Sequence, residues 1–523
     1  MNLKTLIDRN SLFIFSIFIF STVINYYYAS LGAFPLDTFF HFDLGYRILE
    51  GEVPFTDIWM VSGVLVNYIQ AFFFYILGIN WTSYVFHASL INGLISVATY
   101  FVLKNFNLNI NYCFIYSLLF SILGYTSSGT PFVDHHSAFF SLIGVYSLLL
   151  AIKSEKKIFW ILLPIFMGFG FLSKQVPTSY VIFSTTIIIL FYSYVFKKIE
   201  YIKHILIGSL IFVFFVFLFG ILNGIRFENF IQQYILYPQT IGDSRLENLN
   251  LTFRGTVDHF KFIYLSIAPI FFINFKKIIY ETGYVKKKNF FYFTTILFFT
   301  LSLIFHQLLT KNQTFIFFLI PLLAAFSHKA IEETQLRKKN LILIFLVIYC
   351  VLVTSKYHIR FNEGRKFHEL SKVDFSKSIE ATKIHKKLKG LKWISPEYKN
   401  DVEDEINLIN RIKNHLKSDK RKKMVITNYS FFSSILNEKL FSPSMAYTDD
   451  GTTYPLKKSK YYQEYKNLII EVIKKNNVEV IYIIDPVKKA SIYDYLDQSC
   501  FKEKLIFEKL NSYELKNCKD LKG

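Results

Sequence analysis

The sequence predicts a polytopic α-helical membrane protein with a small soluble α/β domain at its C-terminus. Of its 523 residues, 52% are hydrophobic and 19% are aromatic, including 59 Phe and 35 Tyr. The apolar residues gather in runs of roughly 14–22, mostly near the length that crosses about 30 Å of hydrocarbon as a helix. In lipid only helices and closed barrels satisfy their backbone, and barrel strands alternate instead of forming such runs. From about residue 356 the composition shifts to charged and mixed sequence.

Twelve apolar runs are candidate spans, and the charge of the loops decides which of them cross. Loops rich in Lys and Arg stay on the cytoplasmic side. The basic segments are the N-terminus, with Lys4 and Arg9, and the connections 153–157, 197–203, 276–288 and 328–339. All of them share one face only if the run 62–78 does not cross, so we predict that this run is a juxtamembrane helix. The eleven predicted spans are 11–30, 83–104, 112–125, 136–153, 158–173, 177–196, 203–223, 260–275, 289–308, 314–329 and 340–355.

This count predicts a membrane domain at residues 1–355 with a cytoplasmic N-terminus, and a periplasmic domain at 356–523. The low-glycine usage, rich in Lys, Ile, Asn and Phe, is typical of an AT-rich bacterial genome, so we expect the bacterial inner membrane. The formal net charge of +20 does not indicate nucleic acid, because Lys and Arg fall in short loops and in the tail.

An acidic loop follows the first apolar run, at residues 31–59. It contains Asp37, Asp43, Glu50, Glu52 and Asp57 against a single Arg47. Carboxylates at the edge of the lipid are costly to keep and therefore indicate function. The segment DTFFHFDLGYRIL places apolar side chains on one helical stripe and charged ones on the next. This pattern predicts an amphipathic helix on the membrane surface.

The acids of this loop have both structural and functional interpretations. Asp37 follows a Phe-Pro-Leu turn, so it either caps the helix or acts as a general base on an acceptor hydroxyl. Asp57 ends the segment PFTD and is either the cap of the next helix or a second site residue. Asp43 either is solvated or orients Arg47, and both are candidates for substrate binding.

A second polar cluster, Asp134-His135-His136, opens the span 136–153 on the predicted outer face. Asp134 either caps this helix or forms a second acidic element over the same cavity as the first loop. The histidines are candidates for contact with a phosphate or a metal. Adjacent residues point in different directions on a helix, so we do not expect both to bind one ion.

Several cationic and polar residues on the predicted outer face are candidates for binding an anionic phosphate. Lys174, in the segment FLSKQ, lies outside against the positive-inside trend. It either pairs with a phosphate or extends to the interface as a snorkelling side chain. The other candidates, each with a plain polar turn or solvated loop as the alternative, are Gln175, Arg245, His306 and Lys311. The long outer segment 226–259 is predicted to be a surface helix followed by a polar loop.

In the tail, residues 403–418 and 459–476 have helical apolar spacing, while 424–427 and 478–485 are typical of buried strands. Cys500 and Cys518 can pair as a disulfide if the tail lies in an oxidising compartment. The tail has no glycine-rich phosphate loop, and the chain has no Cys or His spacing typical of a metal site. We therefore expect no cofactor, although a divalent metal stays open.

The first outer loop resembles that of the GT-C glycosyltransferases that use polyprenyl-phosphate sugars, such as protein O-mannosyltransferases and aminoarabinose transferases. The match consists of Asp37, a short helix, the segment GEVPFTD ending at Asp57, and a non-crossing helix that closes with Leu77-Gly78. The segment TPFVDHHSAFFSL resembles the second outer loop of the family, and FLSKQ resembles a basic position seen in many relatives. Many relatives have Asp-Glu at the first position, whereas Thr38 follows Asp37 here.

The resemblance implies an integral membrane glycosyltransferase that moves a sugar from a polyprenyl-phosphate carrier to a lipid, glycan or protein acceptor on the outer face. Asp37 would be the general base, and cations would stabilise the leaving phosphate. Two other functions are weighed against it: a transporter or flippase, and a polymerase, for lipid-linked saccharides. A transporter would show internal repeats and charged or broken helices at mid-membrane. A polymerase would use Arg-rich loops.

Overall fold

The computed structural model describes residues 8–280, 284–311 and 316–521, with the backbone alone at 276–280 and 284–287. Lys4 and most of the predicted basic connection 276–288 lie outside the described side chains. The chain divides into two compact units. Unit 1 comprises Met1–Ser30, Val85–Val216 and Asn248–Phe367; unit 2 comprises Leu31–Tyr84, Phe217–Glu247 and His368–Gly523. Each unit thus consists of three separate segments of the chain, whereas the predicted domain boundary is a single cut at residue 355. That boundary stays a prediction.

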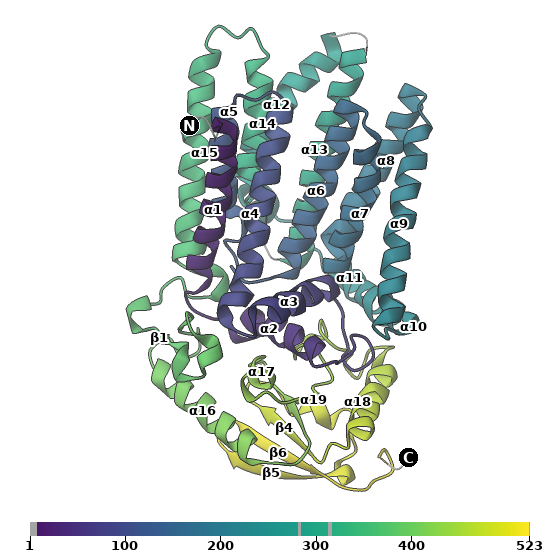
Figure 1. Ribbon diagram of the computed structural model, residues 1–523, viewed down its shortest axis with the longest axis vertical. Coiled ribbons are helices and arrows are strands. Elements are labelled where there is room, and N and C mark those ends of the chain that lie inside the picture. The colour runs from purple at the N-terminus through teal and green to yellow at the C-terminus, as the bar shows by residue number, and fades with distance from the viewer. Residues whose placement is uncertain (1–7, 281–283, 312–315, 522–523) are drawn as a thin grey trace, which may run out of the picture. The chain divides into compact units, whose positions relative to one another are not determined.

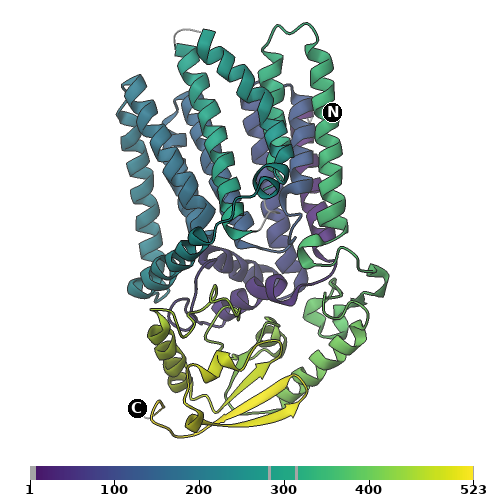
Figure 2. The same cartoon turned by 180° about the vertical axis from the view of Figure 1, so that it is seen from behind.

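All eleven predicted spans form helices. Figures 1 and 2 show the helices of unit 1 side by side with roughly parallel axes. The helices are α1 (Arg9–Ala29), α4 (Trp81–Asn105), α5 (Ile110–Gly124), α6 (Val133–Ser154), α7 (Lys157–Ser173), α8 (Gln175–Phe196), α9 (Glu200–Leu222), α12 (Lys261–Tyr280), α13 (Tyr284–Thr310), α14 (Leu319–Glu332) and α15 (Lys339–His358).

Seven helices within the described residues are long and apolar enough to cross a membrane, namely those of α1, α4, α6, α8, α9, α13 and α15. Shorter apolar helices lie in α5, α7 and α12, and a fourth is the helix Val64–Leu77. Helix α14 starts five residues later than the predicted span 314–329 and is buried almost throughout. The chain is thus a multi-pass membrane protein.

Glu155 and Asp134 mark the two ends of helix α6 in unit 1. Glu155, which follows α6, pairs with Lys198, which lies between α8 and α9. It also pairs with Lys288 of α13 at 2.9 Å. Three of the predicted cytoplasmic connections therefore meet at one end. Asp134 lies in the first turn of the same helix. Because α6 has 22 residues, Asp134 is about 30 Å away, at the other end.

In unit 2 the first outer loop forms α2 (Pro35–Leu49) and α3 (Val64–Leu77). The predicted surface helix and the predicted helix 62–78 therefore both exist. They pack closely, since a Cβ atom on Gly45 of α2 would lie 2.7 Å from the Gln70 side chain of α3. The long outer segment forms α10 (Phe227–Phe230), the π-helix η2 (Ile231–Leu236) and α11 (Tyr237–Glu247). Whether α3 avoids crossing the bilayer stays a prediction.

The tail forms a small α/β fold around a four-stranded sheet in the order β3-β4-β6-β5. Strands β3 (Lys423–Ile426) and β4 (Val480–Ile484) are parallel and fully buried, as their apolar runs predict. Strands β6 (Leu510–Leu515) and β5 (Phe501–Phe507) continue it as an antiparallel hairpin. Helices α16 (Val402–Ser418) and α18 (Tyr462–Asn476) match the predicted helical segments. A two-stranded ladder joins β1 (Ile379–Glu380) to β2 (Lys392–Trp393), and Cys500 and Cys518 form a disulfide.

Candidate functional site

Asp37 lies half-buried in the first turn of α2, in unit 2. It is not the N-cap. That position belongs to Phe34, whose backbone N–H donates to the Thr38 hydroxyl at 2.9 Å. Pro35 opens the helix, where a missing N–H costs nothing. The capping interpretation of Asp37 is therefore wrong, although a carboxylate in a first turn still interacts favourably with the helix dipole.

Asp43 and Arg47 follow on the same helix and form an ion cluster with Glu52. The Arg47 side chain is only 2% exposed and donates to Glu52 at 2.6 and 3.0 Å. The carboxylate of Asp43 lies 3.8 Å from Nη1 of Arg47. Burial raises the pKa of Asp43, and the guanidinium of Arg47 offsets part of that rise. Asp43 thus faces Arg47, as one of its two interpretations predicts, while Glu52 was not singled out by the sequence.

A polar cavity of 20 Å³ adjoins this cluster. Its walls include Asp43 and the hydroxyl-bearing residues Thr427, Ser433, Ser442 and Tyr447. Among the described residues, Oδ1 of Asp43 is buried there without a hydrogen-bond partner. The cavity is large enough for one water, since a water requires about 10–15 Å³ of such volume.

Asp57 is held in a turn of the first loop. Its Oδ2 accepts the Val53 N–H at 2.8 Å, and its Oδ1 lies 2.6 Å from Nζ of Lys475 on α18. Helix α3 begins seven residues later, with Gly63 as its N-cap. Asp57 therefore does not cap that helix. It closes a local turn and ties it to the tail, and its site role stays a prediction.

In unit 1, the structure brings Asp134, Lys174 and His306 together. The ammonium of Lys174 lies 2.8 Å from both oxygens of Asp134, and Nε2 of His306 lies 2.9 Å from one of them. The side chain of Asp134 is 6% exposed and that of His306 is 1% exposed, whereas that of Lys174 is 20% exposed. The Lys174 carbonyl also accepts the Ser137 hydroxyl of α6 at 3.1 Å, which fixes the start of α8 against the helix that carries Asp134. Lys174 is thus the member of the cluster that solvent can reach.

His135 and His136 are both fully buried, and both contact Tyr125. His136 bonds through Nδ1 to the Tyr125 hydroxyl at 2.8 Å and through Nε2 to His87 at 3.0 Å. The ring of His135 stacks on Tyr125 with centroids 4.4 Å apart. Across the described residues no group of three His, Cys, Asp or Glu side chains is arranged to hold a metal.

The remaining candidates lie on separate elements of the chain. Gln175 is the half-buried first residue of α8, and Lys311 is exposed just after α13. Arg245 of α11 is half-buried in unit 2. Burial raises the pKa of Asp450, but hydrogen bonds from Thr452 and the charge of Arg245 together hold that pKa below its ordinary value. Lys311 is thus open to solvent, whereas Arg245 interacts with the carboxyl of Asp450.

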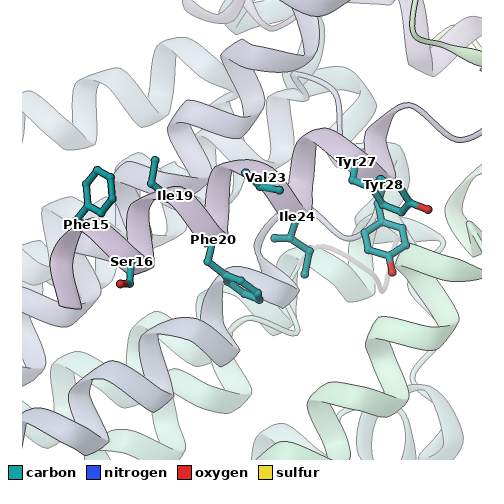
Figure 3. A pocket seen from close by; sticks show the side chains of 8 residues that line it. All are labelled: Phe15, Ser16, Ile19, Phe20, Val23, Ile24, Tyr27 and Tyr28. Atoms are coloured by element: carbon teal, nitrogen blue, oxygen red, sulfur yellow. The ribbon is translucent and has the colours of Figure 1, made fainter. Parts of the chain in front are cut away.

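An apolar groove of 590 Å³ follows one face of α1 (Figure 3). None of the predicted site residues lines it. It is the kind of face that a membrane helix turns to acyl chains. Its lining residues are Phe15, Ser16, Ile19, Phe20, Val23, Ile24, Tyr27 and Tyr28.

No protein-family model matches the chain, and no curated protein matches it. Among solved structures, it is similar to ArnT from Cupriavidus metallidurans bound to undecaprenyl phosphate. That match has a TM-score of 0.52 and 8% identity, and covers 95% of this chain and 97% of ArnT. The Archaeoglobus fulgidus oligosaccharyltransferase in complex with zinc and sulfate matches with a TM-score of 0.42 and 12% identity, over 90% of this chain and 68% of that chain. The chain therefore has the GT-C fold of ArnT, as the resemblance of its first outer loop predicts.

Proposed function

We propose that the chain is an integral membrane glycosyltransferase that moves a sugar from a polyprenyl-phosphate carrier to a lipid, glycan or protein acceptor. The observation that carries the proposal is the fold, shared over nearly the whole of both chains with ArnT, whose structure holds undecaprenyl phosphate. The acidic first loop and the Asp134–Lys174–His306 cluster support it, because the proposed reaction uses one base and at least one cation.

In the proposed reaction Asp37 is the general base. Its carboxylate takes the proton of the acceptor hydroxyl while that oxygen forms a bond to the anomeric carbon of the sugar. The bond from this carbon to the phosphate oxygen breaks, and its electron pair leaves with the polyprenyl phosphate. The position of Asp37 in the first turn of α2, half-buried and not used as the N-cap, supports this role.

Lys174 is the proposed contact for the lipid phosphate. It is the exposed member of its cluster, and a phosphate oxygen would compete with Asp134 for its ammonium. Asp134 and His306 act through Lys174 by holding it at the start of α8. Arg245, Gln175 and Lys311 are proposed as further contacts for the substrates, and the proposal includes no nucleotide or resident metal.

We further propose that the membrane is the bacterial inner membrane, with the N-terminus in the cytoplasm and the tail in the periplasm. The disulfide between Cys500 and Cys518 supports this side for the tail, because disulfides persist in oxidising compartments. The meeting of basic connections around Glu155 supports the opposite side for that end of unit 1.

The test uses the full-length chain in proteoliposomes with radiolabelled undecaprenyl-phosphate sugars. Envelope lipid, glycan and protein fractions serve as acceptors. Asp37→Asn is expected to abolish transfer of the label while retaining binding of the donor. Glu50→Gln, an exposed carboxylate at the other end of α2, is the matched control and is expected to retain transfer.

Unchanged transfer by Asp37→Asn would remove the general base from the proposal. If the wild-type chain moves the labelled donor across the bilayer but transfers no sugar, the chain is a transporter instead.

A further inference from the structure

Helix α2, which carries Asp37, is held near its beginning by the C-terminal part of unit 2. The N–H groups of Gly32 and Ala33 donate to the carbonyls of Lys392 and Ile394, both at 2.9 Å. Leu31 forms a parallel bridge with Lys392, so the segment before α2 adds to the edge of β2. Backbone pairing of this kind fixes both the position and the direction of the entering chain.

The same attachment requires a glycine. Gly32 has a left-handed φ of 72°, and a Cβ atom there would lie 2.3 Å from Cδ1 of Leu370. Any side chain at residue 32 would therefore strain the backbone and push against a fully buried leucine. The attachment at the start of α2 therefore depends on glycine at residue 32.

The far end of α2 is held through Arg47. Its Nη2 donates to the backbone carbonyl of Ser442 at 2.5 Å, in addition to the bonds with Glu52. Ser442 begins residues 442–455, which we call the strap. A buried guanidinium bonded to both a carboxylate and a carbonyl is a rigid connector, because its donors form a planar fork.

The strap also binds the rest of the first loop. The Trp59 N–H donates to the Pro443 carbonyl at 2.9 Å, and the Val61 N–H lies 3.4 Å from the sulfur of Met445. From the other long outer segment, the Tyr237 hydroxyl donates to the Gly451 carbonyl. One tail segment therefore joins the first outer loop and the long outer segment, which lie far apart in the sequence.

We propose that the C-terminal domain is a positioning clamp for Asp37, and that Arg47 and Gly32 are its positioning residues. The inference rests on the proposed function. A general base works only within hydrogen-bond reach of its proton, and a displacement of about 1 Å costs about 100-fold in rate. Asp37 lies between the two attachments on one continuous helix, so both ends of that helix set its position. This gives the tail a role in the reaction without contact with the substrate.

The test compares Arg47→Lys and Gly32→Ala with wild type in the full-length chain. Lysine keeps the charge but cannot form the fork, and alanine disturbs the other attachment. Each is expected to lower kcat by about 100-fold with an unchanged KM for undecaprenyl-phosphate sugar. Lys488→Gln, an exposed residue that pairs with Asp449 of the strap, is the matched control and is expected to keep the wild-type kcat.

Hydrogen–deuterium exchange of residues 35–49 is the second measurement, and it needs no activity. Exchange in this peptide is expected to rise in both variants while exchange in β3 and β4 stays at the wild-type level. A wild-type kcat in both folded variants, a loss of activity that only follows the loss of folded protein, or unchanged exchange at 35–49 would each overturn the clamp. If wild type transfers no sugar, the proposed function fails, and the exchange result still decides whether α2 is clamped.

Discussion

The ammonium group of Lys174 lies 2.8 Å from each carboxylate oxygen of Asp134, 40 residues before it in the chain. This pairing explains why a lysine is kept on the predicted outer face, against the positive-inside trend. Asp134 supplies its counter-charge, and His306 adds a second hydrogen bond to the same carboxylate. The ammonium is thus oriented before any substrate arrives, and an anionic ligand would find it already in place.

Replacing Lys174 by glutamine is expected to weaken the binding of the lipid phosphate. A hydrogen bond to a charged group contributes about 1.5–3 kcal/mol, so KM for undecaprenyl-phosphate sugar should rise by about tenfold or more. Steady-state kinetics in proteoliposomes measures the change. Lys261→Gln, which removes an exposed ammonium paired with Asp258, should leave KM unchanged. A wild-type KM in Lys174→Gln would exclude Lys174 as the phosphate contact.

The membrane helices were predictable from the sequence because each of them needs an apolar run of its own. A helix that crosses hydrocarbon needs a continuous apolar run, so the runs in the sequence locate the helices. The tail was less predictable. The hairpin of β5 and β6 was not anticipated, because β5 has the sequence FKEKLIF and all but one of its residues are exposed or half-buried. Its pairing with β6 is decided by the sheet, not by its own apolar pattern.

The candidate site also has a part that the sequence could predict and a part that it could not. Asp134, Lys174 and His306 could be selected as ionisable residues beside apolar runs, but their meeting is a property of helix packing. The partners of Arg47 and Gly32 had no sequence signal. Ser442 accepts from Arg47 and Lys392 accepts from Gly32 through backbone carbonyls, which every residue has. Glu52 was visible only as one acid among several in the loop.

Removing the disulfide is expected to destabilise the tail. Cys500 and Cys518 are 18 residues apart, and closing a loop of that size contributes about 3 kcal/mol through the unfolded chain. The double variant Cys500→Ser/Cys518→Ser should therefore unfold at a lower temperature than wild type in a protease-resistance assay of the tail. Dithiothreitol should lower the wild-type value to that of the variant and leave the variant itself unchanged. A reductant effect of equal size in both proteins would show that the disulfide is not its cause.

The stability of the tail should depend on acid pH through Asp419. Burial raises the pKa of this carboxyl, but hydrogen bonds from Arg421 and Tyr482 outweigh it and hold the pKa below its ordinary value. The folded pKa is thus lower than the unfolded one, so its stabilising contribution is complete above the unfolded pKa of about 3.9. It is lost as the pH falls through the folded pKa.

Asp419→Asn should therefore lower the free energy of unfolding at neutral pH, and the difference from wild type should shrink as the pH drops below about 4. Denaturant unfolding of the full chain, followed through the tail, measures this difference across the pH range. Asp497→Asn tests whether a solvent-exposed carboxyl behaves in the same way. A difference that grows toward low pH would contradict the assignment.

The sidedness of the chain can be tested by labelling single introduced cysteines with a membrane-impermeant maleimide in spheroplasts. Wild type is the background control, because Cys113 and Cys350 are buried and the other two cysteines are paired. Asp449→Cys in the strap and Ile79→Cys, just after α3, should react in intact spheroplasts. Lys156→Cys, in an exposed basic connection beside Glu155, should react only after permeabilisation. The reason is that Lys and Arg hold their loops on the cytoplasmic side, and α3 must not cross if those loops are to share it. The reverse pattern in intact spheroplasts, with residue 156 labelled and residues 79 and 449 protected, would contradict the orientation predicted from a non-crossing α3.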